Sequence, residues 1–256
     1  MTIKEVFSNP TVKQVIMQIK FPNLFYIESR MEDFEVRIMK EFPESSLVFH
    51  RSVLLADIGP EGRLEKIPDQ GGVPGKKMWQ FKSEKGYVVN VHTDNLAIVS
   101  DYHKTYNLGE GDKFRDIIKM VLDAFFETMS IPLVTYVGLR YIDECPVISK
   151  DDTVFRSWYN SAFPMDRFSI ADASAMEFVT TVKKGHFGLR YAESLKEISK
   201  GDYRLVLDFD GQAGRTESRD CLNVLDALHE IISEEYDKTI KEPVKNYMRQ
   251  KEVRTA

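Results

Sequence analysis

The stretch that decides the fold runs from Asp112 to Asp143 and reads DKFRDIIKMVLDAFFETMSIPLVTYVGLRYID. Apolar residues recur every three or four positions as far as Met129, which predicts an amphipathic helix with Asp112 as its N-cap. Pro132 then interrupts the pattern, and the apolar run of residues 134–141 predicts a strand. At 1.5 Å per residue the helix would be roughly 28 Å long, enough to cross a sheet of four or five strands.

Upstream of this stretch, the chain predicts a strand, a helix and a series of further strands. Residues 12–21 alternate between apolar and polar side chains, as a half-buried strand does. Residues 27–42 carry apolar side chains at helical spacing, and Pro43 ends the pattern. Apolar alternation and turn residues then predict strands at residues 47–58, 78–82, 87–93 and 96–102.

Residues 59–77 have the composition of a long loop. The sequence GPEGRLEKIPDQGGVPGKK contains five glycines and three prolines, which neither a helix nor a central strand tolerates. Long loops in compact domains are often either functional or disordered, and composition does not choose between these alternatives. The GGVPGKK segment lacks the glycine spacing and the Ser or Thr of a phosphate-binding loop, so we reject that function.

Downstream, the order of strands, loop and long helix is predicted a second time. Strands at residues 176–182, 186–192 and 203–210 precede a helix from about Arg219 to Ile240. We therefore predict an α+β fold, with antiparallel sheets and long amphipathic helices packed on one face, in two pseudo-repeated halves. The predicted division is an α+β half at residues 1–148, an irregular linker at 149–174 and an α+β half at 175–256. One continuous domain is the alternative.

Composition and charge narrow the classes of function. The chain is 43% hydrophobic, like a globular protein, yet no run approaches the ~18 apolar residues of a membrane span. The N-terminus lacks the apolar segment of a secretory signal, so we expect a cytoplasmic protein without membrane contact. The net charge of −5 argues against general nucleic-acid binding. A homo-oligomer or a protein partner is compatible with the sequence.

The residue types that carry most enzyme chemistry form no recognised motif. Cys145 and Cys221 lack metal or redox spacing and are expected to be small buried hydrophobic residues. The five histidines are scattered, so each is interpreted as a surface or hydrogen-bonded imidazole. Residues 208–211 begin like a calcium loop but lack its glycine and glutamate, which favours an acidic turn at a strand end. We predict no catalytic residue, no cofactor and no metal.

One place remains where a ligand would be sought. If Leu139 faces the core, Arg140 projects from the other sheet face, where it can bind a carboxylate or phosphate or pair with an acid such as Asp101 or Asp143. Arg190, in the second Gly-Leu-Arg-Tyr of the chain, has the same two interpretations. The predicted ligand-binding residues are Arg140, Asp143, Glu144 and Arg190.

The linker contains a cluster of aromatic residues, Phe155, Trp158, Tyr159 and Phe163. Exposed aromatic side chains mark interaction surfaces in many proteins. Such a cluster also commonly covers an adjacent core. The sequence leaves both interpretations open.

Several short motifs act together as a family signature. They are Ile19-Lys20-Phe21-Pro22, Trp79-Gln80-Phe81-Lys82-Ser83, Val137-Gly138-Leu139-Arg140-Tyr141-Ile142 and the terminal helix with Leu225, Leu228-His229 and Ile232. In combination the chain resembles a sporadically distributed family of uncharacterised prokaryotic proteins of similar length. The resemblance covers most of the chain and implies a bacterial or archaeal cytoplasmic protein. It implies no activity and transfers no catalytic residue.

The missing catalytic motif makes a non-enzymatic binding or protein-interaction module the first hypothesis. The alternative is a small-molecule enzyme or ligand-binding protein in which Arg140 and Arg190 anchor an anion in a sheet-lined cleft. This alternative requires both guanidinium groups to point into one cavity.

Overall fold

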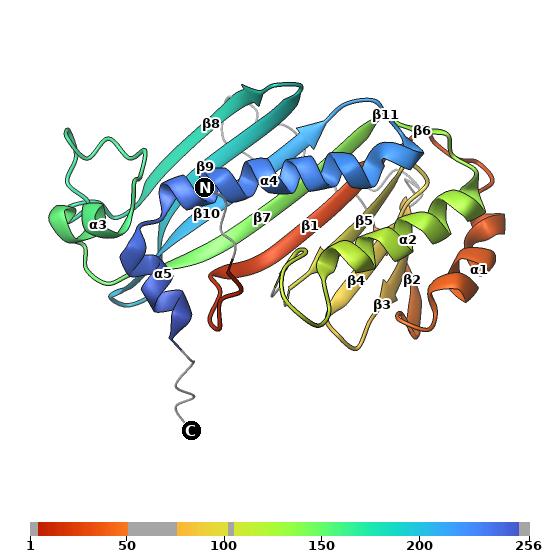
Figure 1. Ribbon diagram of the computed structural model, residues 1–256, viewed down its shortest axis with the longest axis horizontal. Helices are drawn as coiled ribbons and strands as arrows, with labels where there is room; N and C mark the ends of the chain where they lie inside the picture. Colours follow the sequence, from red (N-terminus) through yellow and green to blue (C-terminus); the bar gives the residue numbers. More distant parts are fainter. Residues whose placement is uncertain (1–4, 51–75, 102–104, 251–256) are drawn as a thin grey trace, which may run out of the picture.

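The computed structural model describes residues 5–50, 76–101 and 105–250 (Figure 1). Within these residues, nine strands form one sheet in which every neighbouring pair is antiparallel. In order across the sheet, the strands are β2 (Glu44–His50), β3 (Lys76–Lys82), β4 (Tyr87–Val91), β5 (Asn95–Ser100), β1 (Val12–Lys20), β7 (Tyr136–Val147), β10 (Asp202–Ala213), β9 (Phe187–Ser199) and β8 (Met176–Lys184). The predicted α+β class with an antiparallel sheet is confirmed.

The helices form a second layer on one face of this sheet. They are α1 (Ile27–Ile38), α2 (Phe114–Met129), α3 (Asp152–Trp158), α4 (Cys221–Thr239) and α5 (Glu242–Arg249). Figure 1 shows α2 and α4 crossing the same face, with α1 beside α2 and with α3 and α5 at the opposite end. Two short strands, β6 (Leu133–Val134) and β11 (Thr216–Glu217), pair with each other next to the start of α4. The other sheet face carries no helix of the described chain, and none of its helices is long and apolar enough to cross a membrane.

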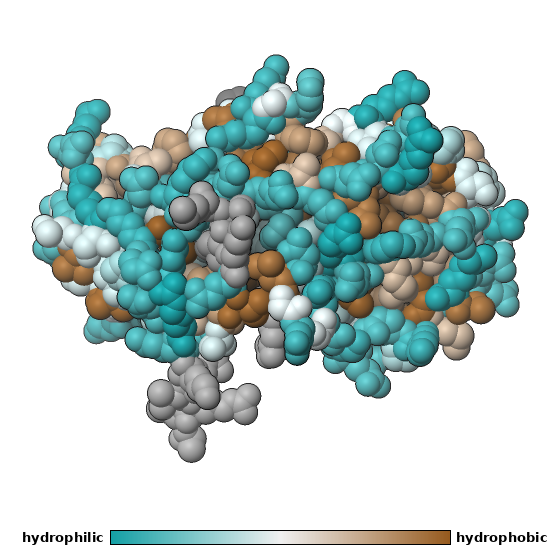
Figure 2. Space-filling model, viewed as in Figure 1, coloured by the Kyte–Doolittle hydropathy of each residue, from teal (hydrophilic) through white to brown (hydrophobic). Residues whose placement is uncertain are grey.

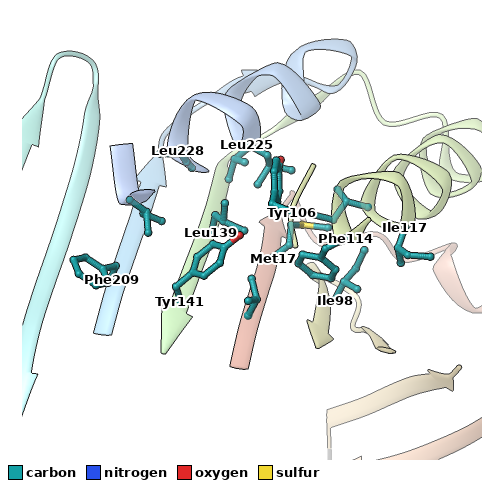
Figure 3. Close-up of a cluster of buried hydrophobic side chains, with 14 of the residues drawn as sticks. Met17, Ile98, Tyr106, Phe114, Ile117, Leu139, Tyr141, Phe209, Leu225 and Leu228 are labelled. Carbon is teal, nitrogen blue, oxygen red and sulfur yellow. The ribbon is translucent and has the colours of Figure 1, made fainter. Parts of the chain in front are cut away.

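The core lies between the sheet and its helices. Strand alternation turns Met17 and Leu139 toward the helices, while α4 presents Leu225 and Leu228 from above (Figure 3). Buried side chains from both ends of the chain form one hydrophobic cluster. Gly211 of β10 lets α4 pack close to the sheet, because a Cβ atom at this position would lie only 3.2–3.3 Å from the side chains of Ile232 and Leu228 on α4.

The predicted halves share this sheet and core. β1 pairs with β5 on one side and with β7 on the other, and β7 in turn pairs with β10. The sheet therefore continues across residue 148, the predicted end of the first half. The pseudo-repeat of the two halves stays a prediction.

Several predicted boundaries differ from the observed elements. β7 continues to Val147 and β10 continues to Ala213, because the two strands pair with each other from Val137 opposite Ala213 to Val147 opposite Tyr203. The acidic segment 208–211 thus lies inside a strand, and its interpretation as a strand-end turn is wrong. The N-cap of α2 is Lys113 and not Asp112. Most of the predicted loop at 59–77 lies outside the described residues, and its last two residues begin β3.

The linker aromatics belong to the core. Phe155, Tyr159 and Phe163 are buried, and Trp158 packs partly buried against the same cluster. The Tyr159 hydroxyl donates to the backbone oxygen of Pro146 at 2.6 Å. The interpretation of these residues as a cover for the core is confirmed.

Candidate functional site

Two of the predicted ligand-binding residues meet on the sheet face without helices. Arg140 of β7 donates two hydrogen bonds to Asp208 of β10, from Nε to Oδ1 at 2.7 Å and from Nη2 to Oδ2 at 2.8 Å. Arg190 of β9 donates to the same carboxylate, from Nη1 to Oδ2 at 2.9 Å. The partner acid is therefore Asp208, and neither Asp101 nor Asp143 has that role. We call Arg140 and Arg190 the arginine pair.

The charges around the arginine pair are balanced. Asp210 lies opposite both Arg140 and Arg190 in the strand register, so two guanidinium groups face two carboxyl groups. Burial raises the pKa of Asp210, and the nearby charge of Arg140 opposes that rise. Burial would also raise the pKa of Asp208, but hydrogen bonds from the arginine pair outweigh it and lower the pKa. An anion at this position would compete with a carboxylate that is already in place.

The other two predicted residues do not form one site with the arginine pair. Because β7 continues past Tyr141, its side chains keep alternating between the two faces. Glu144 is half-buried on the same face as Arg140, whereas Asp143 points toward the helices and is only 2% exposed. The predicted set is thus divided between opposite faces of the sheet.

Asp143 instead lines a pocket between α4 and the sheet, which we call the α4 pocket. Its volume is about 120 Å³. It is bounded by residues 5–12, by residues 105–108, by β7 and by the end of α5. In Figure 2 apolar side chains reach the surface in the lower middle of this face, where the N-terminal segment lies in Figure 1. One face of α4 completes the wall with His229, Ile232, Ser233 and Tyr236.

An irregularity in β1 positions the polar part of this wall. Val12 lies opposite Asp143 and Gln14 lies opposite Ile142, so β1 accommodates one extra residue between them. Such a β-bulge bends its strand and redirects neighbouring side chains. Thr11, directly before the bulge, is buried and donates its hydroxyl proton to Asp143 Oδ1 at 2.8 Å.

Tyr236 extends this arrangement to α4. Because the Thr11 proton goes to Asp143, the Tyr236 hydroxyl donates to Thr11 Oγ1, at 2.6 Å. Within the described parts of the chain, Thr11 is the one hydrogen-bond partner of the Asp143 carboxyl group. The carboxyl group therefore keeps the capacity for another hydrogen bond toward the pocket.

A second polar group lies across the pocket on α4. The His229 ring stacks on Tyr106, with centroids 4.1 Å apart, and its Nδ1 shares a hydrogen bond of 3.1 Å with the Tyr141 hydroxyl. The Tyr106 hydroxyl donates to Asp226 Oδ1 at 2.9 Å. Arg115 of α2 binds both oxygens of Asp226, at 2.8 and 2.7 Å. This network attaches residues 105–108 to α4. Figure 3 shows Tyr106 and Tyr141 between the sheet and α4.

Burial shifts the pKa values of the titratable groups in the pocket so that the neutral form of each group is favoured. It raises the pKa of Asp143 to about 7, although the hydrogen bond from Thr11 opposes the rise. It lowers the pKa of His229 to about 4, against the opposing charge of Asp226. Burial also raises the pKa of Tyr141 and of Tyr236 well above their usual range. Near neutral pH, the wall thus presents a neutral imidazole, two hydroxyl groups and a carboxyl group near its midpoint of titration.

The predicted character of the cysteines is confirmed. Cys145 and Cys221 are both buried and free. Burial raises the pKa of the Cys145 thiol well above its usual range, and the charge of Asp143 adds to the effect. Across residues 5–50, 76–101 and 105–250, no group of three or more His, Cys, Asp and Glu side chains could hold a metal ion.

Sequence reasoning missed most of the α4 pocket. Tyr236 continues the apolar spacing of Leu225, Leu228 and Ile232 in the helix predicted at residues 219–240, and that spacing was the available signal. His229 fits the predicted hydrogen-bonded imidazole, yet nothing in the spacing of the histidines placed it in a pocket. Thr11 gave no signal, because its role depends on a bulge opposite a strand more than 100 residues later.

Comparison with family models, with curated proteins and with solved structures finds no match for this chain. The resemblance to a sporadically distributed prokaryotic family stays a prediction from its short motifs.

Proposed function

We propose that this protein is a non-enzymatic binding protein that holds a small, uncharged, partly apolar ligand in the α4 pocket. One observation carries the proposal. A buried carboxyl group, Asp143, borders a cavity and has Thr11 as its one hydrogen-bond partner among the described residues. Convergent polar groups with shifted pKa values in an otherwise apolar pocket are characteristic of binding sites.

The size and lining of the α4 pocket define the class of ligand. A cavity of about 150 Å³ is large enough for benzene, and the α4 pocket, at about 120 Å³, is of similar size. Phe7, Ile232 and Met248 give it an apolar lining. A charged ligand would lose its hydration there without a matching partner. A hydroxyl or carbonyl group on the ligand would meet Asp143, while the apolar remainder contacts this lining.

Binding is favoured over catalysis by the way the polar groups are already engaged. His229 is stacked on Tyr106 and bonded to Tyr141, and within the described residues its side chain makes no hydrogen bond to Asp143. The thiol of Cys145 is fully buried beneath the same wall. A general base needs to reach the proton that it removes. Asp143 reaches the proton of Thr11, but that hydroxyl is buried and is also bonded to Tyr236, so it is engaged within the fold.

The arginine pair supports the alternative function less well. Both guanidinium groups are on one face, with exposed fractions of 41% and 37%, as an anion anchor requires. Both are bound to Asp208, which is 13% exposed, and Asp210 balances the second charge. A bound phosphate or carboxylate would displace Asp208 or share its partners. We therefore assign the ligand to the α4 pocket.

The test measures binding of phenol and toluene, two probes of similar size that differ in their hydrogen-bonding group. Two-dimensional NMR spectra of the labelled protein are recorded during titration with each probe. Phenol is expected to bind with a dissociation constant on the order of 1 mM, more tightly than toluene. The shifted resonances should belong to Thr11, Asp143 and the pocket face of α4.

Two variants on α4 make the test specific. Ser233→Phe fills the pocket and should abolish binding, whereas Glu234→Phe places the same side chain on the exposed face one residue later. Thermal melts establish that both variants fold. The proposal is overturned if neither probe shifts the pocket resonances, or if Ser233→Phe binds phenol as well as Glu234→Phe does.

A further inference from the structure

The strand β8 forms one edge of the nine-stranded sheet. In the described chain it pairs with β9 along its whole length and has no neighbour on its other side. Two of its apolar side chains, Val179 and Val182, are 48% and 38% exposed. A regular edge of this length with exposed β-branched residues is a template for pairing with another strand.

The sequence of β8, MEFVTTVKK, is complementary to itself in one antiparallel register. A symmetric pair of antiparallel strands has a two-fold axis perpendicular to the sheet. Paired residues then lie on the same face, so one residue faces its own copy and the axis passes between the two. With Thr180 at the centre, Glu177 lies opposite Lys183, Phe178 opposite Val182, and Val179 opposite Thr181. Opposite charges and apolar or β-branched pairs thus coincide along the strand.

The two charged residues that would meet have no partner among the described residues. Neither Glu177 nor Lys183 makes a side-chain hydrogen bond or ion pair with the described residues, and both are exposed. The neighbouring Lys184 differs, since its Nζ binds Glu235 of α4 at 2.9 Å. Lysine at a sheet edge normally discourages pairing, but here each Lys183 would face a glutamate of the second copy.

We propose that β8 pairs antiparallel with β8 of a second copy of this chain, centred on Thr180, to form a two-fold symmetric dimer. The two sheets become one, and both helical layers stay on the same side because the axis is perpendicular to the sheet. Two Glu177–Lys183 ion pairs fix the register. This proposal is independent of the α4 pocket, which lies away from the edge.

Charge reversal tests the register directly. Lys183→Glu places glutamate opposite glutamate twice, and Glu177→Lys places lysine opposite lysine twice. Each single variant is expected to raise the dissociation constant of the dimer about tenfold or more, because two attractive pairs become repulsive. The double variant, Glu177→Lys with Lys183→Glu, restores both attractive pairs and should return the dimer to wild-type strength.

Mixing the single variants gives a second result that only this register predicts. One copy then carries lysine and the other carries glutamate at both positions, so an equimolar mixture should form heterodimers although each variant alone is monomeric. Analytical ultracentrifugation measures the outcome, since the dimer has about twice the protomer mass of 29.6 kDa. Circular dichroism establishes that each variant is folded.

A variant at the opposite edge serves as control. Leu47→Lys on β2 adds a charge to the other exposed edge and should leave the dimer unchanged. The proposal is overturned if the wild type is monomeric up to about 100 μM, if the single charge reversals leave the dimer intact, or if Leu47→Lys dissociates it.

Discussion

Asp143 links the stability of the fold to the state of the α4 pocket. Its carboxyl group is buried at the centre of the sheet, next to the bulge in β1 that brings Thr11 to it. The folded state favours the protonated form, because ionisation there has a large desolvation cost. The same group that is available to a ligand therefore destabilises the empty protein at high pH.

Replacing this carboxyl group should remove a pH dependence of stability. The pKa of Asp143 is about 7 in the folded chain and 3.8 ordinarily. Its protonated form is favoured by folding, so its contribution to stability is fully present below pH 4 and is lost as the pH rises from there through 7. We expect Asp143→Asn to gain on the wild type between pH 5 and 8.5, by roughly 2.5–3 kcal/mol in free energy of unfolding. Urea denaturation at pH 5 to 8.5 measures the difference.

The pKa of His229 is shifted in the opposite direction, and it affects the stability of the wild type and of Asp143→Asn alike. Its pKa is lowered to about 4, so its contribution is present above pH 6.5 and is lost as the pH falls toward 4. The difference between wild type and Asp143→Asn largely cancels this contribution. Parallel stability curves for the two proteins would contradict the assignment of a raised pKa to Asp143.

At the residue scale, the sequence predicted which side chains were candidates for a site better than it predicted the side chains that they contact. Arg140 and Arg190 were identified, but their partner Asp208 was interpreted as part of a turn. Alternation along a strand predicts which face a residue occupies. It does not predict which strand lies beside it, and that neighbour determines the contacts of Arg140 and Arg190 with Asp208.

Among the elements, α2 shows how a helix end is adapted to the following chain. Ser130 ends the helix with φ 53° and ψ 40°, and its backbone N–H donates to the Phe126 oxygen at 2.8 Å. This left-handed conformation is strained for a residue with a side chain and is easily adopted by glycine. Ser130 is exposed, so little packing is lost if the side chain is removed.

We therefore expect Ser130→Gly to stabilise the protein. Relief of the strained backbone should add about 0.5–1 kcal/mol to the free energy of unfolding, a rise in Tm of roughly 1–4 °C for a chain of this size. Calorimetry measures it. As control, Glu32→Gly at an exposed position inside α1 should lower stability by about 1 kcal/mol. A loss of stability in Ser130→Gly would show that the serine side chain has an unrecognised role.

Elements were predictable where periodicity was strong. The apolar stripes predicted α1, α2 and α4 to within a few residues. The ends of β7 and β10 were missed because β7 continues with Asp143 and Glu144 and β10 with Gly211 and Gln212, residues of weak strand pattern that are kept extended by pairing between the two strands. The short helix α5 was missed, since eight residues with two buried apolar side chains give little pattern.

For the whole molecule, the continuous sheet predicts cooperative unfolding. The chain has two tryptophans, one in the predicted first half and one in the predicted linker, which is bonded to the second half. Trp79 lies in β3, while Trp158 ends α3, where its backbone oxygen accepts from Lys241 at 2.9 Å. Because β1 and β7 join the two parts through a shared core, neither part should unfold alone.

The single-tryptophan variants Trp79→Phe and Trp158→Phe report on the two parts separately. Fluorescence midpoints in urea should coincide for the two variants once corrected for their stabilities, and should match the midpoint from circular dichroism. Two separate midpoints would instead support independent domains at residues 1–148 and 175–256.

The strand order was beyond prediction from the sequence. The number of strands and the α+β class follow from local patterns, but the order depends on which edges meet. The central pair of β1 and β7 joins residues 12–20 to residues 136–143. No local sequence pattern specifies that pairing. It depends on the free energy of packing the whole core.

The position of β1 in the middle of the sheet has a consequence for synthesis on the ribosome. Val15 pairs with Ser100, about 85 residues later, and Val12 pairs with Asp143. At 5–20 residues per second, roughly 4–17 s pass between translation of β1 and of its first partner. Throughout this interval, a strand carrying Met17 and Ile19 is without either neighbour. We infer that the nascent chain, and not the finished protein, is the form most exposed to aggregation and most dependent on chaperones.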